Sequence, residues 1–452
     1  MATAKMAKRA PVGAWRRLLV LASAAAPLAA AFAATDPGVR PGPSGAGGAL
    51  PGITPLESKF FGAGFDEFSE EQSVMGEKFV PDTEPGLGPR FNGNSCSSCH
   101  AQPATGGTSP ADNPQVALAT LAGGANSVPW FITAKGPVRE ARFKLKPDGT
   151  PDGGVSNLFT IAGRIDAPGC NIAQPDFGAP GNTNLIFRIP TPVFGGGLIE
   201  AIPDEVILAN KYALPVEKAK LGIGGRENRN PNDGTITRFG WKAQVKGLLL
   251  FAGEAYNVEQ GVTNELFGDE RDLDVACHFN PLPEDTTTLS ATAKTGVPSN
   301  IVLQAFFVRL LAPPAPAPET PSIAATTAGR AQFDAIGCAL CHTPSLKTGR
   351  RSVAALSGQY AALYSDLLLH HMGTGLEDGI AMGVAGGDEF RSAPLWGLGQ
   401  RIFFLHDGRT TDLIQAIQAH ASPGSEANLV EANYEALSDV DKQYLLYFLR
   451  SL

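Results

Sequence analysis

The chain contains two copies of one five-residue pattern, Cys96-Ser97-Ser98-Cys99-His100 and Cys338-Ala339-Leu340-Cys341-His342. This Cys-x-x-Cys-His spacing is typical of c-type haem attachment. Two cysteines three residues apart lie on one side of a helical turn, where both sulfurs can bond to the vinyl groups of haem. The histidine that follows can then supply a nitrogen to the iron. We therefore expect two covalently bound haem c groups, attached at Cys96, Cys99, Cys338 and Cys341, with His100 and His342 as iron ligands.

The separation of the two patterns argues against other uses of paired cysteines. A zinc ribbon pairs its two Cys-x-x-Cys units about fifteen to twenty residues apart, whereas these two lie 242 residues apart. A thioredoxin-like motif would not require a histidine after both copies. The two remaining cysteines, Cys170 and Cys277, most simply form a disulfide in an oxidising compartment. Cys277-His278 also resembles the end of a haem motif, but Asp274 stands at the first cysteine position.

The N-terminus has the pattern of an export signal. A basic start (Lys5, Lys8, Arg9, Arg16 and Arg17) precedes an apolar stretch that ends in the A-x-A site Ala31-Phe32-Ala33. The stretch is short for a membrane span. We expect residues 1–33 to be a cleaved signal peptide, and the mature protein to be periplasmic and without a membrane span.

The charge balance limits the class of partner. Removal of the five basic residues of the signal would change the formal net charge from −8 to −13. Such an acidic protein is not expected to bind nucleic acid or anionic membranes. It favours a small redox protein with a basic surface as the electron donor.

Composition divides the mature chain. Residues 34–56 are rich in Gly, Pro, Ala and Ser and predict a disordered or extended leader. Residues 313–321 form a Pro-rich linker. The linker separates an N-terminal haem domain, residues 57–312, from a C-terminal cytochrome c-like domain, residues 322–452. The expected fold is mainly α, with two c-type cytochrome-like haem domains, of which the N-terminal one is large and loop-rich with a few short strands.

Hydrophobic periodicity predicts the elements. In the C-terminal domain we expect helices over 325–336 and 356–372, and a third helix that carries Leu413, Ile417 and His420 on one face. A last helix begins at Ser438 and is expected to bury Val440, Leu445, Phe448 and Leu452. In the N-terminal domain, helices are expected over 242–256 and 300–311, and strands near 138–146 and 185–189.

Five further segments complete the pattern: Gly86-Leu87-Gly88-Pro89-Arg90-Phe91-Asn92, Ile189-Pro190-Thr191-Pro192-Val193-Phe194-Gly195, Arg238-Phe239-Gly240-Trp241-Lys242-Ala243, Phe390-Arg391-Ser392-Ala393-Pro394-Leu395-Trp396-Gly397 and Leu405-His406-Asp407-Gly408-Arg409. With them the chain resembles the di-haem oxidoreductase (peroxidase) family, which is similar to the bacterial di-haem cytochrome c peroxidases. The resemblance implies that the C-terminal haem accepts electrons and that the N-terminal haem reduces hydrogen peroxide. In similar peroxidases a calcium ion bridges the domains.

Two other functions are open. A quinone-cofactor-forming enzyme and certain rubber oxygenases are similar in architecture, so the chain could be a haem oxidase or oxygenase that uses oxygen on an organic or protein substrate. The third function is non-catalytic electron transfer, which requires two protein ligands on both irons. A large apolar pocket beside the first haem would favour the oxygenase.

The remaining ligands separate these functions. His420 is the predicted second ligand of the C-terminal iron, because it follows His406 by fourteen residues, where similar peroxidases place a methionine. Its rivals are Met372, Met382, His370 and His371. No histidine lies between His100 and His278, so we expect the N-terminal iron to keep one position open. The alternative is that Met75 or His278 reaches this iron.

Six more residues are considered for roles at the haems. Glu200 follows a glycine-rich loop and is the candidate acid–base group for peroxide cleavage, with a pKa raised by an apolar setting. Trp241 is the candidate electron relay between the haems, and Trp396 competes for that role. Arg409 is expected to neutralise a haem propionate, with His406 nearby and its ring fixed by Asp407.

Overall fold

The computed structural model describes residues 33–76, 84–288 and 297–452. Residues 34–452 form one compact unit. The expected signal peptide, apart from Ala33, lies outside the described residues. Within the described ranges the regular structure is rich in helix and includes several small sheets, which agrees with the expected mainly α class.

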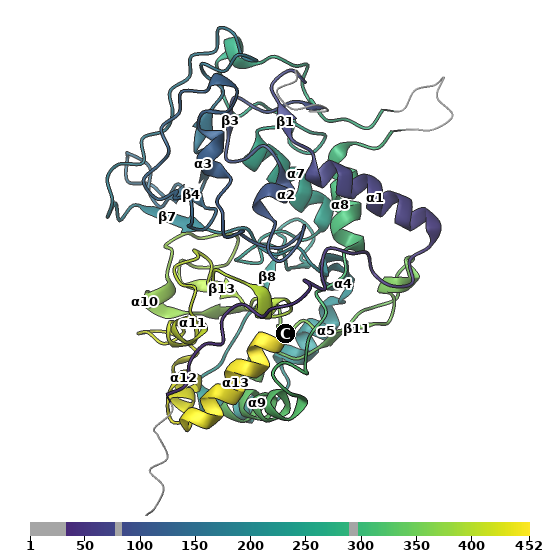
Figure 1. Cartoon of the computed structure of the whole chain (residues 1–452), viewed down its shortest axis with the longest axis vertical. Helices are drawn as coiled ribbons and strands as arrows, with labels where there is room; N and C mark the ends of the chain where they lie inside the picture. The colour runs from purple at the N-terminus through teal and green to yellow at the C-terminus, as the bar shows by residue number, and fades with distance from the viewer. Residues whose placement is uncertain (1–32, 77–83, 289–296) are drawn as a thin grey trace, which may run out of the picture. The chain divides into compact units, whose positions relative to one another are not determined.

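The helices are short to medium in length (Figure 1). The α-helices are α1 (Pro55–Ser69), α2 (Cys96–Cys99), α3 (Gln115–Leu118), α4 (Gly196–Ala201), α5 (Asp204–Lys211), α6 (Pro215–Leu221), α7 (Leu248–Gln260), α8 (Asn300–Leu310), α9 (Ile323–Ile336), α10 (Gly373–Leu376), α11 (Leu413–Gln418), α12 (Asn428–Glu435) and α13 (Asp439–Ser451). The 3₁₀ turns are η1 (Leu121–Gly123), η2 (Val275–Cys277), η3 (Cys338–Leu340), η4 (Ala354–Leu356) and η5 (Leu398–Gln400).

The strands have two to four residues each and form small separate sheets. They are β1 (Gln72–Ser73), β2 (Glu84–Pro85), β3 (Arg90–Phe91), β4 (Glu140–Phe143), β5 (Val155–Ser156), β6 (Phe159–Thr160), β7 (Leu185–Arg188), β8 (Asn228–Arg229), β9 (Ile236–Thr237), β10 (Leu346–Lys347), β11 (Tyr360–Ala361), β12 (Leu369–His371) and β13 (Glu389–Arg391). The largest sheet has the order β5-β4-β7 and is antiparallel, and its two longer strands confirm those predicted near 138–146 and 185–189.

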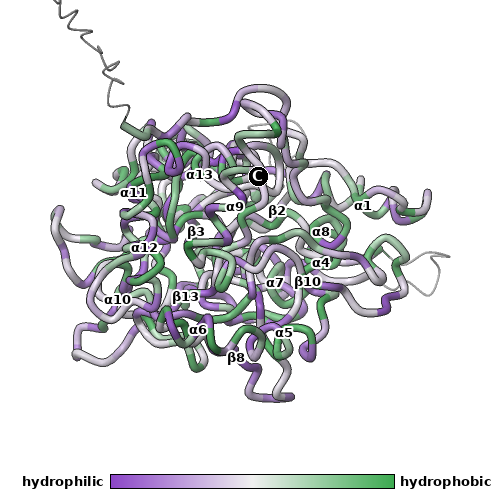
Figure 2. Tube along the Cα trace, turned by 90° about the horizontal axis from the view of Figure 1, so that it is seen from below, coloured by the Kyte–Doolittle hydropathy of each residue, from purple (hydrophilic) through white to green (hydrophobic). Residues whose placement is uncertain are grey.

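Hydrophobic and hydrophilic stretches alternate at short intervals along the trace (Figure 2). Among the helices of the described ranges, none combines the length and the apolar character that a membrane span requires.

Two helix pairs pack closely, and each lies beside one Cys-x-x-Cys-His motif. Helix α1 packs on α8, and α9 packs on α13 (Figure 1). Glycine allows the close approach in both pairs: a Cβ atom at Gly64 would lie 2.2 Å from the Leu303 carbonyl oxygen, and one at Gly329 would lie 1.9 Å from the Tyr444 carbonyl oxygen. Both crossings therefore depend on a residue without a side chain.

The aromatic contacts of the two helix pairs also correspond. Phe68, four residues after the glycine of α1, contacts Phe307 of α8 with ring centroids 4.9 Å apart. Phe333, four residues after the glycine of α9, contacts Phe448 of α13 at 5.3 Å. All four rings are at most 6% exposed. The two pairs are thus structural counterparts within one chain.

The last helix follows its prediction closely. The Ser438 hydroxyl accepts a hydrogen bond from the Asp441 backbone N–H, which caps α13. Leu445, Phe448 and Leu452 are buried as expected, whereas Val440 is 54% exposed. Val440 lies in the first turn of α13, where the helix extends beyond the core. Helices α8 and α9 also match their predicted ranges, and α7 begins six residues later than predicted.

The helix predicted over 356–372 is wrong. This segment contains η4 and the strands β11 and β12, and β12 pairs antiparallel with β13. Tyr364 and Leu367 have φ angles of 51° and 62°, in the left-handed region, which a right-handed helix cannot contain. Leu367, Leu368 and Leu369 are each 0% exposed. A fully buried apolar run occurs in strands and in helices alike, so its pattern does not distinguish them.

Of the two expectations for the leader, disordered or extended, disorder is contradicted because residues 34–50 have defined contacts. Asp36 forms a buried ion pair with Arg450 of α13 at 2.6 Å. The Leu50 N–H donates to the Leu310 carbonyl oxygen, and Ala315 of the Pro-rich linker donates to Gly45. The leader therefore runs in extended form beside the linker and contacts the last helix. Its composition, rich in Gly and Pro, predicts a lack of regular structure but not a lack of contacts.

Candidate haem sites

Each Cys-x-x-Cys-His motif lines a large cavity. The first cavity is lined by Cys96, Cys99 and His100 and encloses about 1310 Å³ of empty space, including space open to solvent. The second is lined by the Cys338, Cys341 and His342 motif and encloses about 1450 Å³ on the same measure. Each motif therefore lies at the wall of a cavity rather than in a filled core.

The motif histidines are prepared to bind a metal through one nitrogen. The Nδ1–H of His100 donates to the Gly107 carbonyl oxygen at 3.0 Å, and that of His342 donates to the Tyr364 carbonyl oxygen at 3.0 Å. In both rings Nε2 is left as the unprotonated nitrogen. Burial lowers the pKa of both imidazoles to about 4. Both rings are thus neutral at pH 7, the state that an iron ligand requires.

The motif cysteines are available for covalent attachment. None of the four forms a disulfide. Burial raises the pKa of the Cys96, Cys99 and Cys338 thiols to about 12, so these sulfurs are neutral thiols. Two thiols and one neutral imidazole at the wall of each cavity match the donor set of haem c, and both sites fit that group.

The structure brings His420 into the second cavity together with His342. The Nδ1–H of His420 donates to the Ala416 carbonyl oxygen at 2.8 Å, which again leaves Nε2 unprotonated. After burial, the charge of His420 is the next largest cause that lowers the pKa of His342, so the two rings are close. Met372 also lines this cavity and stays a rival ligand.

The other rivals are occupied elsewhere. His370 lines the second cavity, but its two ring nitrogens are bonded to the carboxylates of Asp366 at 3.0 Å and Glu426 at 2.8 Å. His371 is half exposed and pairs with Asp388. Met382 accepts a hydrogen bond from Arg188 at 3.2 Å.

The residues around His406 depart from the prediction. His406 lines the second cavity and stacks on Phe390 with centroids 4.4 Å apart. Asp407 does not fix its ring, because the Asp407 carboxylate pairs with Arg409 at 2.8 Å. The Arg409 side chain is 38% exposed and is not among the residues that line either cavity. Two other arginines, Arg391 and Arg401, line the second cavity.

Within the described residues, no second histidine lines the first cavity. Among its lining residues in the described ranges, His100 is the sole histidine, and methionine is absent. Met75 is 36% exposed and lies outside this lining.

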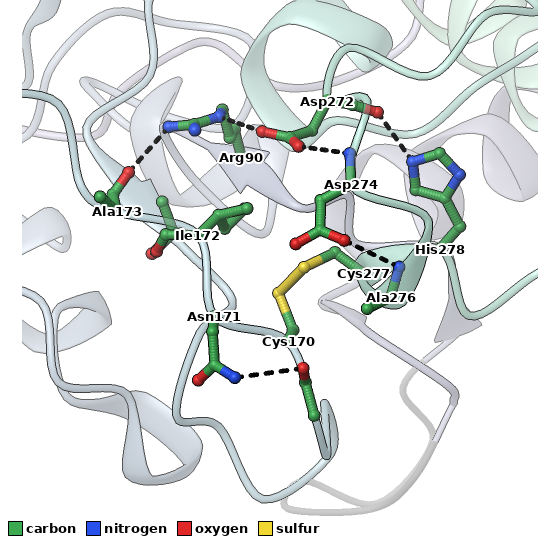
Figure 3. Close-up of a disulfide and its surroundings, with 12 residues drawn as sticks. Arg90, Cys170, Asn171, Ile172, Ala173, Asp272, Asp274, Ala276, Cys277 and His278 are labelled. Atoms are coloured by element: carbon green, nitrogen blue, oxygen red, sulfur yellow. Dashed lines mark hydrogen bonds and ion pairs between the residues drawn. A yellow bond between two sulfur atoms is a disulfide. The ribbon is translucent and has the colours of Figure 1, made fainter.

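His278 lies at the disulfide between Cys170 and Cys277, which the structure confirms (Figure 3). Its Nε2–H donates to the Asp272 carbonyl oxygen at 2.7 Å. His278 is outside the lining of the first cavity. Apart from His100, the described lining therefore offers no histidine or methionine to an iron.

Three glutamates line the first cavity, and the sequence analysis missed them. They are Glu140 of β4 and Glu254 and Glu259 of α7. Burial raises the pKa of Glu254. Arg142, another lining residue, donates to the Glu140 carboxylate at 2.8 Å.

Glu140 and Glu259 form a hydrogen-bonded pair of carboxyl groups. Burial, together with the charge of Glu140, raises the pKa of Glu259 to about 8. Burial also disfavours the charged form of Glu140, but Arg142 and Arg188 outweigh it and lower the pKa of Glu140. At neutral pH the pair therefore holds one proton, on Glu259, while Glu140 is ionised.

Glu200, the predicted acid–base residue, lies elsewhere. Its carboxylate pairs with Arg309 at 2.7 Å, accepts from the Leu248 backbone N–H at 2.9 Å, and is outside the lining of the first cavity. Burial alone would raise the pKa of Glu200, but Arg309 outweighs it and the pKa is lowered, opposite to the prediction. The glycines before it serve helix packing: a Cβ atom at Gly197 would lie 1.9 Å from the Arg309 carbonyl oxygen.

Trp241 lines both cavities. The indole N–H donates to the Ile189 carbonyl oxygen at 3.0 Å, and the side chain is buried. Trp396, the competing tryptophan, packs against Gly195 and lines neither cavity. The structure thus brings Trp241, and not Trp396, to the wall that both cavities share.

Comparisons with known proteins agree with this chemistry. Residues 181–452, more than half of the chain, match the family model described as "Di-haem oxidoreductase, putative peroxidase". No curated protein matches the chain in sequence.

Two solved structures are similar to the chain. One is a hydrazine synthase from Kuenenia stuttgartiensis, with 13% identity, 93% of this chain and 98% of that chain covered, and a TM-score of 0.36. The other is a MauG-like protein associated with microbial copper homeostasis, with 15% identity, 63% and 95% covered, and a TM-score of 0.30. These TM-scores are too low to support a conclusion.

Proposed function

We propose, on the premise that the chain belongs to the di-haem oxidoreductase family, that it is a periplasmic di-haem c-type peroxidase. Hydrogen peroxide would react in the first cavity, and electrons from a small redox protein would enter through the second. The haem groups, when bound, would supply the electron-transfer chemistry. The Cys170–Cys277 disulfide supports an oxidising compartment such as the periplasm.

The observation that carries this proposal is the Glu140–Glu259 pair in a cavity whose described lining holds no histidine or methionine besides His100. Reduction of hydrogen peroxide to two water molecules consumes two electrons and two protons. The Glu259 carboxyl oxygen holds a proton at neutral pH and can donate it to the leaving oxygen as a general acid. Arg142 keeps Glu140 ionised, and the charge of Glu140 keeps that proton on Glu259. We assign the acid role to Glu259 in place of Glu200.

The second cavity is suited to electron transfer. We propose that His342 and His420 would hold the iron of the second haem through their Nε2 atoms, a pair of ligands that suits electron transfer. Trp241, which lines both cavities, would lie on the path between the haems.

The lining of the first cavity favours the peroxidase over the oxygenase alternative. It includes Arg139, Glu140, Arg142, Arg188, Glu254 and Glu259. A small polar oxidant such as peroxide suits these charged groups, although apolar residues such as Phe251, Val258 and Val308 also line the cavity and keep the oxygenase as the second candidate. A non-catalytic carrier would need a second ligand opposite His100.

The test is low-temperature EPR of the ferric protein, compared with His420→Ala and with the exposed control His371→Ala. We expect one high-spin and one low-spin haem in the wild type and in the control, and loss of the low-spin signal in His420→Ala. Turnover of peroxide with a reduced cytochrome should accompany the high-spin signal. Two low-spin haems in the wild type, or no peroxide-dependent oxidation above that of free haem, would refute the proposal.

A bridging calcium ion stays a prediction from the resemblance, to be tested by metal analysis of the purified protein. The identity of the redox protein is likewise a matter for experiment.

A further inference from the structure

Two arginines are buried in the second cavity without a carboxylate of their own. Arg391 and Arg401 are 6% and 7% exposed, and both line the cavity that contains Cys338 and Cys341. Arg391 donates from Nε to the Gly240 carbonyl oxygen at 3.1 Å and makes a long contact with Ser392. For the Arg401 guanidinium, the described residues provide no hydrogen bond and no ion pair.

Burial without a counter-ion is unfavourable for both guanidinium groups. Burial lowers the pKa of each to about 10, and for Arg391 the charge of Arg401 adds to the effect. The one carboxylate that acts on Arg391 is Asp366. Its oxygens are already bonded to His370 at 3.0 Å and to the Ser392 hydroxyl at 2.6 Å. An uncompensated buried cation costs several kcal/mol, so this pair calls for an anion in the cavity.

We propose that Arg391 and Arg401 bind the two propionate carboxylates of the haem attached at Cys338 and Cys341. The charges match, since two guanidinium groups face a group with two carboxylates. The planar guanidinium also suits a carboxylate, which it can bind through two parallel hydrogen bonds. The inference rests on the proposed function only in that a haem occupies the second cavity, and it does not depend on peroxide reduction.

Arg391 also holds the backbone next to the candidate relay. Its backbone N–H donates to the Trp241 carbonyl oxygen at 2.9 Å, and its Nε–H donates to the preceding residue, Gly240. The arginine that binds a propionate thus also fixes the position of Trp241. Propionates held by Arg391 would therefore lie near Gly240 and Trp241, which also line the first cavity.

The test is a spectroelectrochemical titration of the complete di-haem protein without peroxide, read at the low-spin haem. Positive charge beside the haem favours the reduced state, which has one positive charge fewer. Arg401→Gln and Arg391→Gln should each lower the equilibrium constant for reduction of this haem at least tenfold. This corresponds to a fall in the midpoint potential of about 59 mV for one electron. Arg409→Gln is the matched control, because Arg409 is ion-paired outside the cavities, and its midpoint should equal that of the wild type.

An unchanged midpoint in both glutamine variants would overturn the assignment. So would a wild-type midpoint that depends on chloride concentration, because a small free anion would then occupy the pair. Where a glutamine variant does not fold, Arg401→Lys and Arg391→Lys keep the charge, and the readout becomes the redox-induced infrared difference spectrum. The propionate carboxylate bands should shift in the lysine variants, and unshifted bands would refute the contact. Low peroxidase activity alone would bear on the proposed function and not on this inference.

Discussion

Glu259→Gln removes the carboxyl that holds a proton in the first cavity, with little change in size. Burial and the charge of Glu140 raise the pKa of this carboxyl to about 8, so its protonated form prevails at pH 7. General acid catalysis by a placed side chain contributes about 10²–10⁴-fold. We therefore expect the second-order rate constant for peroxide to fall by about 10²-fold or more at pH 7.

The assay is stopped-flow mixing of the reduced protein with peroxide between pH 5 and pH 10. Because the acid is lost when Glu259 ionises, the wild-type rate should fall as the pH rises through about 8. The glutamine variant should be slow at every pH and should lack this fall. Glu140→Gln removes the charge that raises the pKa of Glu259, so the fall in rate should move to lower pH.

Glu200→Gln is the control, because Glu200 is paired with Arg309 outside the first cavity. It should react with peroxide at the wild-type rate. The reasoning is wrong if Glu259→Gln lowers the rate by less than about threefold while keeping the wild-type pH dependence, or if Glu200→Gln has the larger effect.

Three further predictions concern packing and electron transfer. Gly329→Ala should lower the free energy of unfolding by about 2 kcal/mol, because its Cβ would lie 1.9 Å from the Tyr444 carbonyl oxygen. Asp36→Asn should lower the free energy of unfolding by about 3 kcal/mol, because it leaves the buried Arg450 guanidinium without its counter-ion. Burial alone would raise the pKa of Asp36, but the hydrogen bond and charge of Arg450 outweigh it, and the pKa is lowered. The ion pair therefore stabilises the folded protein at pH values above the pKa of Asp36 in the unfolded chain. This stabilisation is lost as the pH falls through the pKa in the folded protein. Trp241→Phe removes the hydrogen bond from the indole N–H to the Ile189 carbonyl oxygen. This loss should lower the free energy of unfolding by about 1 kcal/mol. The substitution should also slow electron transfer between the haems.

Denaturant unfolding of the intact protein measures the three stabilities, and flash photolysis of the mixed-valence protein measures the electron transfer. Gly62→Ala on α1 is the control for Gly329→Ala, since a Cβ there meets no atom within 4 Å, and it should stabilise by about 0.5–1 kcal/mol. Equal effects of the two alanines would contradict the packing argument. A change in stability for Asp36→Asn that is the same at pH 3 and pH 7 would contradict the ion pair. An unchanged interhaem rate in Trp241→Phe would exclude the relay.

Local patterns predicted several elements correctly. The cap at Ser438 and the range of α9 follow from residues within one or two turns of one another. The helix predicted over 356–372 is wrong because its leucines are buried on all sides. The N–H groups of Leu367 and Leu368 donate to side chains, and residues 369–371 pair with β13. That pairing involves residues about twenty positions away and leaves no periodic signal.

The candidate site divides in the same way. The pairing of Cys170 with Cys277 could be predicted by counting cysteines, although 107 residues separate them. Glu259 could not be distinguished from Glu200, because the pKa of a carboxyl depends on the charges and the burial around it. Arg391 belongs to one of the segments on which the family resemblance rests, but the sequence does not indicate a role for it. Its role as an anion-binding residue follows from the structure, in which the buried guanidinium forms no ion pair with a carboxylate of the described residues.

By itself, the sequence determined the two attachment motifs, since two cysteines three residues apart and an adjacent histidine share one turn whatever surrounds them. It also determined the membership of the family, through short segments whose residue types are specific. Only the tertiary structure decided which charged groups lie in each cavity, because Glu140 and Glu259, like Arg391 and Arg401, come from different elements. The pKa of a carboxyl and the ion pairing of an arginine depend on the distance to neighbouring charges and on burial. The fold sets this distance and this burial.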